Sequence, residues 1–276
     1  MRVSRIGLAL VGALLAIGCS EDDGPFFAPQ VPLAYTRFIN AIPDTVSVDF
    51  RFVDLLEYSP FGIQIPFRGF TPYQGTAPGA RHLKVFTDWG GDSVFIRHTT
   101  AVILDETPSF EAGKYYTIAA VGYSRTTGTP RVKLQVFEDP IPDPGSNVAF
   151  RVVNLATGLS SLNVGVTANS TDPIPTPTFS NVAYLGASAY VTRPPGTAWF
   201  RVQETTAAAE IVTGAGRQAP AGAAGDPLNN LTTIGGAAQA GSVVTAYVFP
   251  RSVAGSRAPA AFTTPAIVFV VDKHPR

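Results

Sequence analysis

The segment Val46-Ser47-Val48-Asp49-Phe50-Arg51-Phe52 decides the fold class of this chain. Its even-numbered residues are apolar and its odd-numbered residues are polar or charged. An alternation with a period of two predicts a β-strand with one buried face and one face toward water. The segment Leu162-Asn163-Val164-Gly165-Val166 has the same alternation, so half-buried strands are expected in both parts of the chain.

Turns and further strands surround these two segments. The 276 residues include 26 glycines and 24 prolines, which indicates many short strands joined by turns. Residues 115–121 and 243–249 are apolar on both faces, so we expect them to be central strands. Between the apolar pairs Leu83/Val85 and Val94/Ile96, the sequence Asp88-Trp89-Gly90-Gly91-Asp92 predicts a hairpin turn.

Four segments of the first part recur, in the same order, in the second part. Such a repeat predicts tandem copies of one domain. The paired segments are 37–41 with 151–155, 69–73 with 186–190, 78–85 with 195–202, and 112–117 with 240–245.

The prolines of residues 139–145 predict a stiff linker between the two copies, because alternate prolines do not continue a central strand. We therefore expect β-sandwich domains at 34–142 and 143–276, the second with a flexible Gly/Ala-rich insertion near 213–240. About seven strands in each domain predict all-β architecture, as two tandem Ig-like antiparallel β-sandwich domains. A lipocalin-like barrel is the competing β fold, and the repeat disfavours it.

The first 18 residues predict a cleaved lipoprotein signal peptide. Arg2 and Arg5 precede an apolar run, residues 6–17, that is shorter than the ~20 residues needed to span a bilayer as a helix. The run leads into Ala16-Ile17-Gly18-Cys19, which resembles a lipobox, although Leu is commoner than Ala at its first position. The alternatives are an ordinary secretory signal with a chance cysteine and a short membrane anchor.

Cys19 is the only cysteine of the chain, so neither an internal disulfide nor a thiolate metal site explains it. Lipidation of its thiol is the expected role. The triacylated cysteine that the lipobox implies would anchor the mature protein durably in a membrane. Residues 19–33 are then the lipidated N-terminus and a tether.

The residues after Cys19 and the overall charge refine the location. The tetrad Ser20-Glu21-Asp22-Asp23 has no aspartate directly after the cysteine, which favours the outer membrane. The tetrad is either a surface-export signal or a solvated linker. Cleavage of the signal peptide would remove two of the 20 basic residues, Arg2 and Arg5, and leave 18 basic against 20 acidic residues. This balance argues against nucleic-acid binding.

The first part of the chain contains three short motifs, namely Arg37-Phe38-Ile39-Asn40-Ala41-Ile42-Pro43-Asp44, Ala77-Pro78-Gly79 before a strand, and Ala112-Gly113-Lys114-Tyr115-Tyr116-Thr117. Together they resemble the DUF4397 family of bacterial secreted domains. The resemblance covers about residues 34–140 and is weaker in the second copy, where Thr157-Gly158 replaces the Pro-Asp of the opening motif. The function of the family is unassigned, so the resemblance implies a fold and no active site.

No local motif predicts catalysis. The three histidines, His82, His98 and His274, have no neighbouring metal-type ligands, whereas a zinc site needs three or four. The chain also has no Gly-x-Ser-x-Gly elbow and no P-loop. An envelope hydrolase with a cryptic site is an alternative that would require His82 or His98 to meet carboxylates in a cleft.

Turn residues are the remaining candidates for a site. Asp88 and Asp92 bracket the predicted hairpin turn, and Asp44 and Asp49 bracket a predicted strand, which suits either calcium binding or turn hydrogen bonds. Trp89 at the hairpin tip suits stacking on a sugar or packing against its own sheet. The latter reading is favoured in each case, and no cofactor or metal is expected.

We therefore expect a non-catalytic cell-envelope lipoprotein, displayed from the outer membrane toward the periplasm or the cell surface. Its expected role is a binding or structural module with a protein or glycan partner, in addition to the membrane itself. Function in such folds lies on loops and exposed edges. A further alternative is an assembly component that pairs its strand edges with partners.

Overall fold

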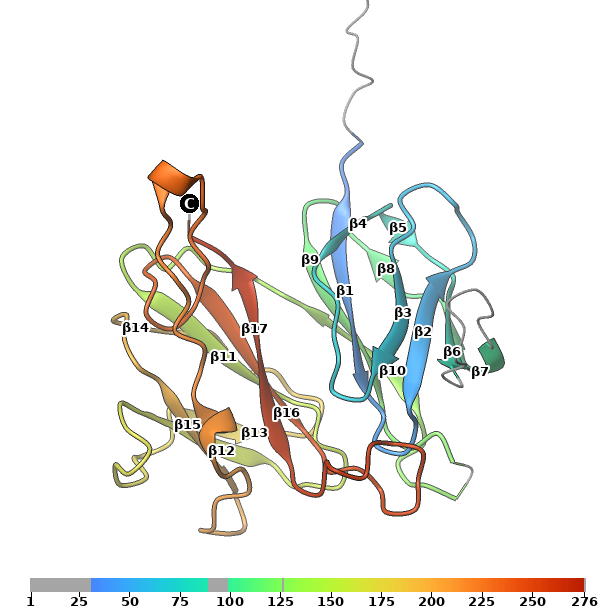
Figure 1. Cartoon of the computed structure of the whole chain (residues 1–276). Coiled ribbons are helices and arrows are strands. Elements are labelled where there is room, and N and C mark those ends of the chain that lie inside the picture. Colours follow the sequence, from blue (N-terminus) through green and yellow to red (C-terminus); the bar gives the residue numbers. More distant parts are fainter. Residues whose placement is uncertain (1–30, 89–98, 126, 276) are drawn as a thin grey trace, which may run out of the picture. The chain divides into compact units, whose positions relative to one another are not determined.

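The computed structural model describes residues 31–88, 99–125 and 127–275, and it is almost entirely β-structure (Figure 1). Strands β1 to β17 form several sheets, and the described helices are two short 3-10 turns. The prediction of an all-β sandwich fold is confirmed. Among the described residues there is no helix with the length and apolar character needed to cross a membrane.

Three sheets are built from the part of the chain before residue 139. The first has the order β10-β9-β1-β4, the second β3-β2-β6-β7, and the third pairs β5 with β8. The bounds are β1 (Ala34–Ala41), β2 (Ser47–Phe52), β3 (Phe61–Pro66), β4 (Gln74–Thr76), β5 (Gly79–Ala80), β6 (Leu83–Asp88), β7 (Thr99–Glu106), β8 (Ser109–Phe110), β9 (Tyr115–Val121) and β10 (Lys133–Glu138).

Two sheets are built from the part after residue 147, with orders β14-β11-β16-β17 and β13-β12-β15. We call residues 34–139 the first half and residues 148–273 the second half. The strand order β17-β16-β11-β14 of the second half matches β10-β9-β1-β4 of the first. The bounds are β11 (Val148–Asn154), β12 (Leu162–Thr167), β13 (Phe179–Val182), β14 (Val191–Arg193), β15 (Trp199–Glu204), η1 (Ala215–Arg217), η2 (Pro227–Asn229), β16 (Val243–Phe249) and β17 (Ala266–Lys273).

One strand pair in each half differs from the antiparallel prediction. β1 pairs with β9 in parallel, and β11 pairs with β16 in parallel, whereas the other ladders are antiparallel. Parallel neighbours need a long crossover connection. The opposing sheet supplies that crossover in each half, because its strands lie between the two paired strands in sequence.

The sheets that contain β1 and β11 bury both of their faces. On β1, Phe38 belongs to the apolar core of the first half, whereas the adjacent Ile39 belongs to a cluster shared by the two halves. The second half supplies Val153 and Tyr247 to this shared cluster. The prediction that β9 and β16 are central strands is confirmed, since each has hydrogen-bonded neighbours on both sides.

The insertion near 213–240 is packed in part against the rest of the second half. Ala219 and Ala237 are buried in the core of the second half. Between them, bridges join Ala223 to Ile234 and Asp226 to Leu231, so the segment forms a hairpin with η2 at its tip. Small residues suit this hairpin because glycine and alanine allow close approach of its backbone: a Cβ on Gly236 would lie 2.3 Å from the amide nitrogen of Gly222.

Candidate functional site

Several candidates from the sequence lie outside the described residues, namely Cys19, Trp89, Asp92 and His98. Asp88 is the last residue of β6, where its backbone faces Ser47 of β2 and Thr99 of β7. The predicted turn and its return strand at Val94/Ile96 lie outside the described residues, and the next described strand that pairs with β6 is β7, which begins at Thr99.

The two candidate calcium ligands of the first half bind protein groups instead. The Asp44 carboxylate accepts hydrogen bonds from the backbone N–H and hydroxyl of Ser124 and from the backbone N–H of Arg125. Asp49 is buried and accepts the backbone N–H of Gln64 at 2.8 Å and a bond from Arg51. Both carboxylates thus accept hydrogen bonds from groups distant in sequence, Ser124, Arg125 and Gln64, and not only from their own turns.

The described histidines also have structural partners. His82 contacts Asp105 on the neighbouring strand β7, and Nδ1 of His274 accepts the backbone N–H of Gly235 at 2.8 Å. Among residues 31–88, 99–125 and 127–275, no three histidine, cysteine or acidic side chains come together in a way that could hold a metal ion.

The principal polar cluster is one that these predictions missed. In the first half, Nε of Arg37 donates to the Thr117 hydroxyl at 2.7 Å, and that hydroxyl donates to Asp139 at 2.6 Å. The Tyr73 hydroxyl also donates to Asp139 at 2.6 Å, and the Arg37 guanidinium lies 4.4 Å from the Tyr73 ring centre. Arginine, threonine, tyrosine and aspartate thus form a closed set, with Arg37 on β1, Thr117 on β9, Tyr73 directly before β4 and Asp139 directly after β10.

The second half repeats this set at equivalent positions. Nε of Arg151 donates to the Thr245 hydroxyl at 2.8 Å, and that hydroxyl donates to Asp272. The Tyr190 hydroxyl donates to Asp272 at 2.9 Å, and the Arg151 guanidinium lies 4.9 Å from the Tyr190 ring centre. Each arginine then crosses to the other half: Arg37 pairs with Asp272, and Arg151 with Asp139. These eight residues and Tyr247 are named here the crossed-arginine network.

The network lies in the interior, where the arginine and aspartate side chains are at most 2% exposed. Burial by itself would lower the pKa of Arg37, but the surrounding Tyr247 and Asp272 raise it well above its usual value. Burial raises the pKa of Tyr247 to about 12, which keeps its hydroxyl protonated as the acceptor of a 2.5 Å bond from Arg37. The two crossed ion pairs of this network join the halves. Because solvent does not reach the network, we assign it a structural role and look for a ligand site elsewhere.

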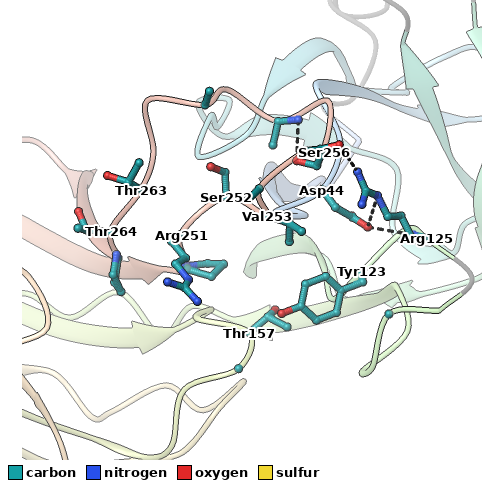
Figure 2. A pocket seen from close by; sticks show the side chains of 18 of the residues that line it. Asp44, Tyr123, Arg125, Thr157, Arg251, Ser252, Val253, Ser256, Thr263 and Thr264 are labelled. Atoms are coloured by element: carbon teal, nitrogen blue, oxygen red, sulfur yellow. Dashed lines mark hydrogen bonds and ion pairs between the residues drawn. The ribbon is translucent and has the colours of Figure 1, made fainter.

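A groove of about 1040 Å³ opens to solvent among the described residues (Figure 2). It lies where β1, β9, β11 and β16 all end, since its wall includes residues that come one to three positions after each of these strands. The segment 250–265, which connects β16 to β17, forms the remaining wall. The lining residues with polar side chains are Asp44, Tyr123, Arg125, Thr127, Thr157, Arg251, Ser252, Ser256, Thr263 and Thr264.

The 250–265 segment is held against the first half by arginine contacts. Arg68 donates to the carbonyls of Pro250 and Thr264, and its guanidinium lies 4.5 Å from the Phe262 ring centre. Arg125 donates to the carbonyl of Gly255 at 2.9 Å. The groove is therefore formed by both halves.

One cation of the groove has no protein partner. Arg251 is exposed, and within the described chain its guanidinium forms no ion pair or hydrogen bond. The hydroxyls of Tyr123, Thr263 and Thr264 belong to the same wall (Figure 2). This wall lacks histidine, and its one carboxylate, Asp44, is bound by backbone N–H groups. The groove thus offers hydrogen bonding and a positive charge.

Residues 34–165 match the model of a family described as "Domain of unknown function (DUF4397)". A DUF4397 domain is found at these residues. The match begins at β1, continues through the connection at 139–147, and ends inside β12. A search of curated proteins found no match.

The DUF4397 segment contains one complete set of the crossed-arginine network, Arg37, Tyr73, Thr117 and Asp139, together with Arg151. The sequence held a signal for this network. The repeat aligns Arg37 with Arg151, Tyr73 with Tyr190 and Thr117 with Thr245. A buried arginine at the same position of two largely apolar strands requires a counter-charge, and the structure supplies it as Asp272 and Asp139.

Proposed function

We propose that this chain is a non-catalytic, lipid-anchored envelope protein that presents a binding groove on the side away from its membrane. The observation that carries the proposal is topological. The chain enters β1 at Ala34, and the groove lies where β1 and its parallel neighbour β9 end. A protein anchored at Cys19 would hold the groove at the opposite end of the strands from its tether.

The second half is proposed to be a divergent copy of the same domain. Support comes from the shared strand order and from the four-residue sets of Arg37 and Arg151. Two copies joined through a buried ion network form a groove that neither copy has alone, because residues of both halves line it. This favours a binding module over a simple spacer.

The groove suits a hydroxyl-rich, anionic ligand such as an acidic glycan. Arg251 provides a positive charge that has no partner among the described residues, and threonine and tyrosine hydroxyls line the same groove. Arginine binds carboxylate groups with two parallel hydrogen bonds, and aromatic rings such as that of Tyr123 stack on sugars.

Ligand binding is tested by titrating the isotope-labelled protein with oligogalacturonate and with an uncharged oligosaccharide of equal length. We expect chemical-shift changes in residues 250–265 with the acidic sugar, and their loss in Arg251→Ala. Lys133→Ala, an exposed cation on β10, is the matched control. Equal changes in the two variants would contradict a role for the groove.

Anchoring is tested separately by substituting Cys19→Ala and following the chain in membrane fractions. We expect loss of the mature, acylated form and of its retention in the outer membrane. Protease added to intact cells then distinguishes a surface location from a periplasmic one. Retention of Cys19→Ala in the same mature form would contradict the lipoprotein proposal.

A further inference from the structure

The loop between β2 and β3 exposes an unusual series of large apolar side chains. Leu56 is fully exposed, Leu55 is 51% exposed and Phe61 is 58% exposed. Val53 and Tyr58 in the same loop are also exposed. Single exposed leucines are normal on protein surfaces, whereas several large exposed apolar side chains in one loop indicate a surface that contacts a partner or a membrane.

The loop is held in this conformation by a buried arginine. Arg81 donates through Nε and Nη2 to the two carboxylate oxygens of Asp54 at 3.0 and 3.1 Å, and to the Ser59 hydroxyl at 2.7 Å. It also donates to the carbonyl of Tyr58 and lies 4.7 Å from the Phe52 ring centre. Asp54, Ser59 and the Tyr58 carbonyl are therefore hydrogen-bonded to the buried Arg81, while the leucines of the loop are exposed.

This loop lies at the end of the first half where the chain enters. The backbone N–H of Ala77 donates to the carbonyl of Tyr58 at 3.0 Å, and the adjacent Thr76 faces Ala34, the first residue of β1. The exposed leucines are thus beside the point where the tether joins the folded chain.

The second half has a matching apolar tip. Leu228 is 97% exposed, and Leu231 and Ile234 are more than half exposed, all in the hairpin that carries η2. The base of this hairpin bonds to His274, which follows the end of β17, and β17 ends beside the start of β16. Figure 1 shows this hairpin and the β2–β3 loop projecting at the end of the described chain where β1 starts.

We propose that these two tips, Leu55–Phe61 and Leu228–Ile234, dock into the interfacial region of the lipid bilayer to which the protein is anchored. The inference rests on the proposed lipidation of Cys19. The 14 residues from Cys19 to Pro32 reach at most about 50 Å when fully extended. Such a tether keeps the tips within reach of the membrane at all times.

A bilayer interface suits these tips better than a protein groove does. The apolar side chains lie on two separate protrusions, one from each half, and such protrusions insert into a soft surface without needing a complementary shape. Apolar and aromatic side chains partition into the headgroup–acyl boundary in the same way in interfacial helices. The exposed Glu57 beside Leu56 favours zwitterionic over anionic lipids.

The test uses the full acylated chain in phosphatidylcholine vesicles that contain a nitroxide-labelled lipid. Acylation blocks the thiol of Cys19, so Leu56→Cys and Leu228→Cys each introduce one reactive thiol for an environment-sensitive fluorophore. Ala254→Cys, an exposed position in the groove wall at the other end of the strands, is the matched control. Thermal unfolding of each variant checks that the fold is retained.

We expect quenching of the labels at positions 56 and 228 by the nitroxide lipid, and none at position 254. If all variants float with the vesicles but positions 56 and 254 are quenched equally, docking is overturned while anchoring stands. If no variant floats, the proposed anchoring fails and docking falls with it. Crosslinking of position 56 to a protein in cells, without quenching in vesicles, would also overturn lipid docking.

Discussion

Arg37 of β1 pairs with Asp272 of β17 across the two halves, with 2.7 Å between Nη2 and Oδ1, and both side chains are inaccessible to solvent. Arg151 and Asp139 form the reciprocal pair. A buried charge without its partner is destabilising by several kcal/mol. Since each half holds the counter-ion of the other, the buried arginine of either half depends on the presence of both. The halves should therefore unfold in one cooperative transition.

Removal of one arginine tests this dependence. We expect Arg37→Ala to lower the free energy of unfolding by about 3 to 5 kcal/mol, because Asp272 is left buried without its ion pair. Urea denaturation followed by circular dichroism measures the change. Arg251→Ala, which alters an exposed arginine, should change stability by less than about 0.5 kcal/mol. A similar small effect for Arg37→Ala would show that the network contributes little.

The tyrosines of the network predict a loss of stability at alkaline pH. Burial raises the pKa of Tyr247 to about 12, and it also raises the pKa of Tyr73 and of Tyr190. Between pH 10 and 12 the folded chain keeps protons that the unfolded chain releases, so stability is full below about pH 10 and falls as the pH approaches 12. Tyr247 alone corresponds to about 2 to 3 kcal/mol.

Absorbance at 295 nm during an alkaline titration checks this prediction. The buried tyrosines should ionise together with unfolding, and not before it. Tyr247→Phe should flatten the decline of stability between pH 10 and 12. Ionisation of all nine tyrosines of the chain near pH 10, with the fold intact, would contradict the described burial.

The strands were predictable because their signal is local. Alternation in residues 46–52 and the apolar runs at 115–121 and 243–249 correspond to β2, β9 and β16. Strand order and parallel pairing are not local properties, because the strands of the opposing sheet lie between β1 and β9 in the sequence. Periodicity alone therefore predicts where the strands are and not which strands pair with each other.

The site was harder to predict because the deciding contacts join residues distant in sequence. Asp139 was interpreted as the first residue of a proline-rich linker, yet it is the counter-ion of Arg151. The apolar tip at Leu55–Phe61 has no periodicity, and its exposure depends on Arg81 bonding Asp54 from within. Single-residue composition does not distinguish an exposed leucine from a buried one.

Two equivalent asparagines give a further prediction for the repeat. Asn40 donates to the carbonyl of Ile65 and accepts the backbone N–H of Ile42, and Asn154 makes the corresponding bonds in the second half. Both are fully buried. Asn40→Ala and Asn154→Ala should each destabilise the chain by about 1 to 3 kcal/mol, since each leaves backbone groups unsatisfied.

Thermal and urea unfolding of the two variants measure these losses side by side. Asn169→Ala, at an exposed turn, is the matched control and should behave like the parent chain. Similar losses for Asn40→Ala and Asn154→Ala are expected from a shared role. A loss in only one of them would mean that the equivalent bonds differ in their contribution.

The β2–β3 loop should lose its order in acid. Burial tends to raise the pKa of Asp54, but hydrogen bonds from Arg81 and from the backbone of His82 outweigh it and lower the pKa to about 2, from an ordinary value of 3.8. The stabilising effect is therefore fully present above about pH 4 and is lost as the pH falls through about 2. Because Asp54 is partly exposed, solvent screening reduces this contribution to less than about 1 kcal/mol.

Asp54→Asn removes this carboxylate and tests its role. We expect the variant to be less stable than the parent chain at pH 6, and the difference to shrink as the pH falls through about 2, where Asp54 of the parent gains its proton and Arg81 loses its counter-ion. Hydrogen exchange of residues 53–61 would report the loop itself. Glu57→Gln, in the same loop, is the matched control and should keep the parent profile. A parallel loss of stability in Asp54→Asn and in the parent, as the pH falls, would mean that the Arg81–Asp54 pair does not order the loop. The outward leucines would then lack the rigid support from which membrane docking was inferred.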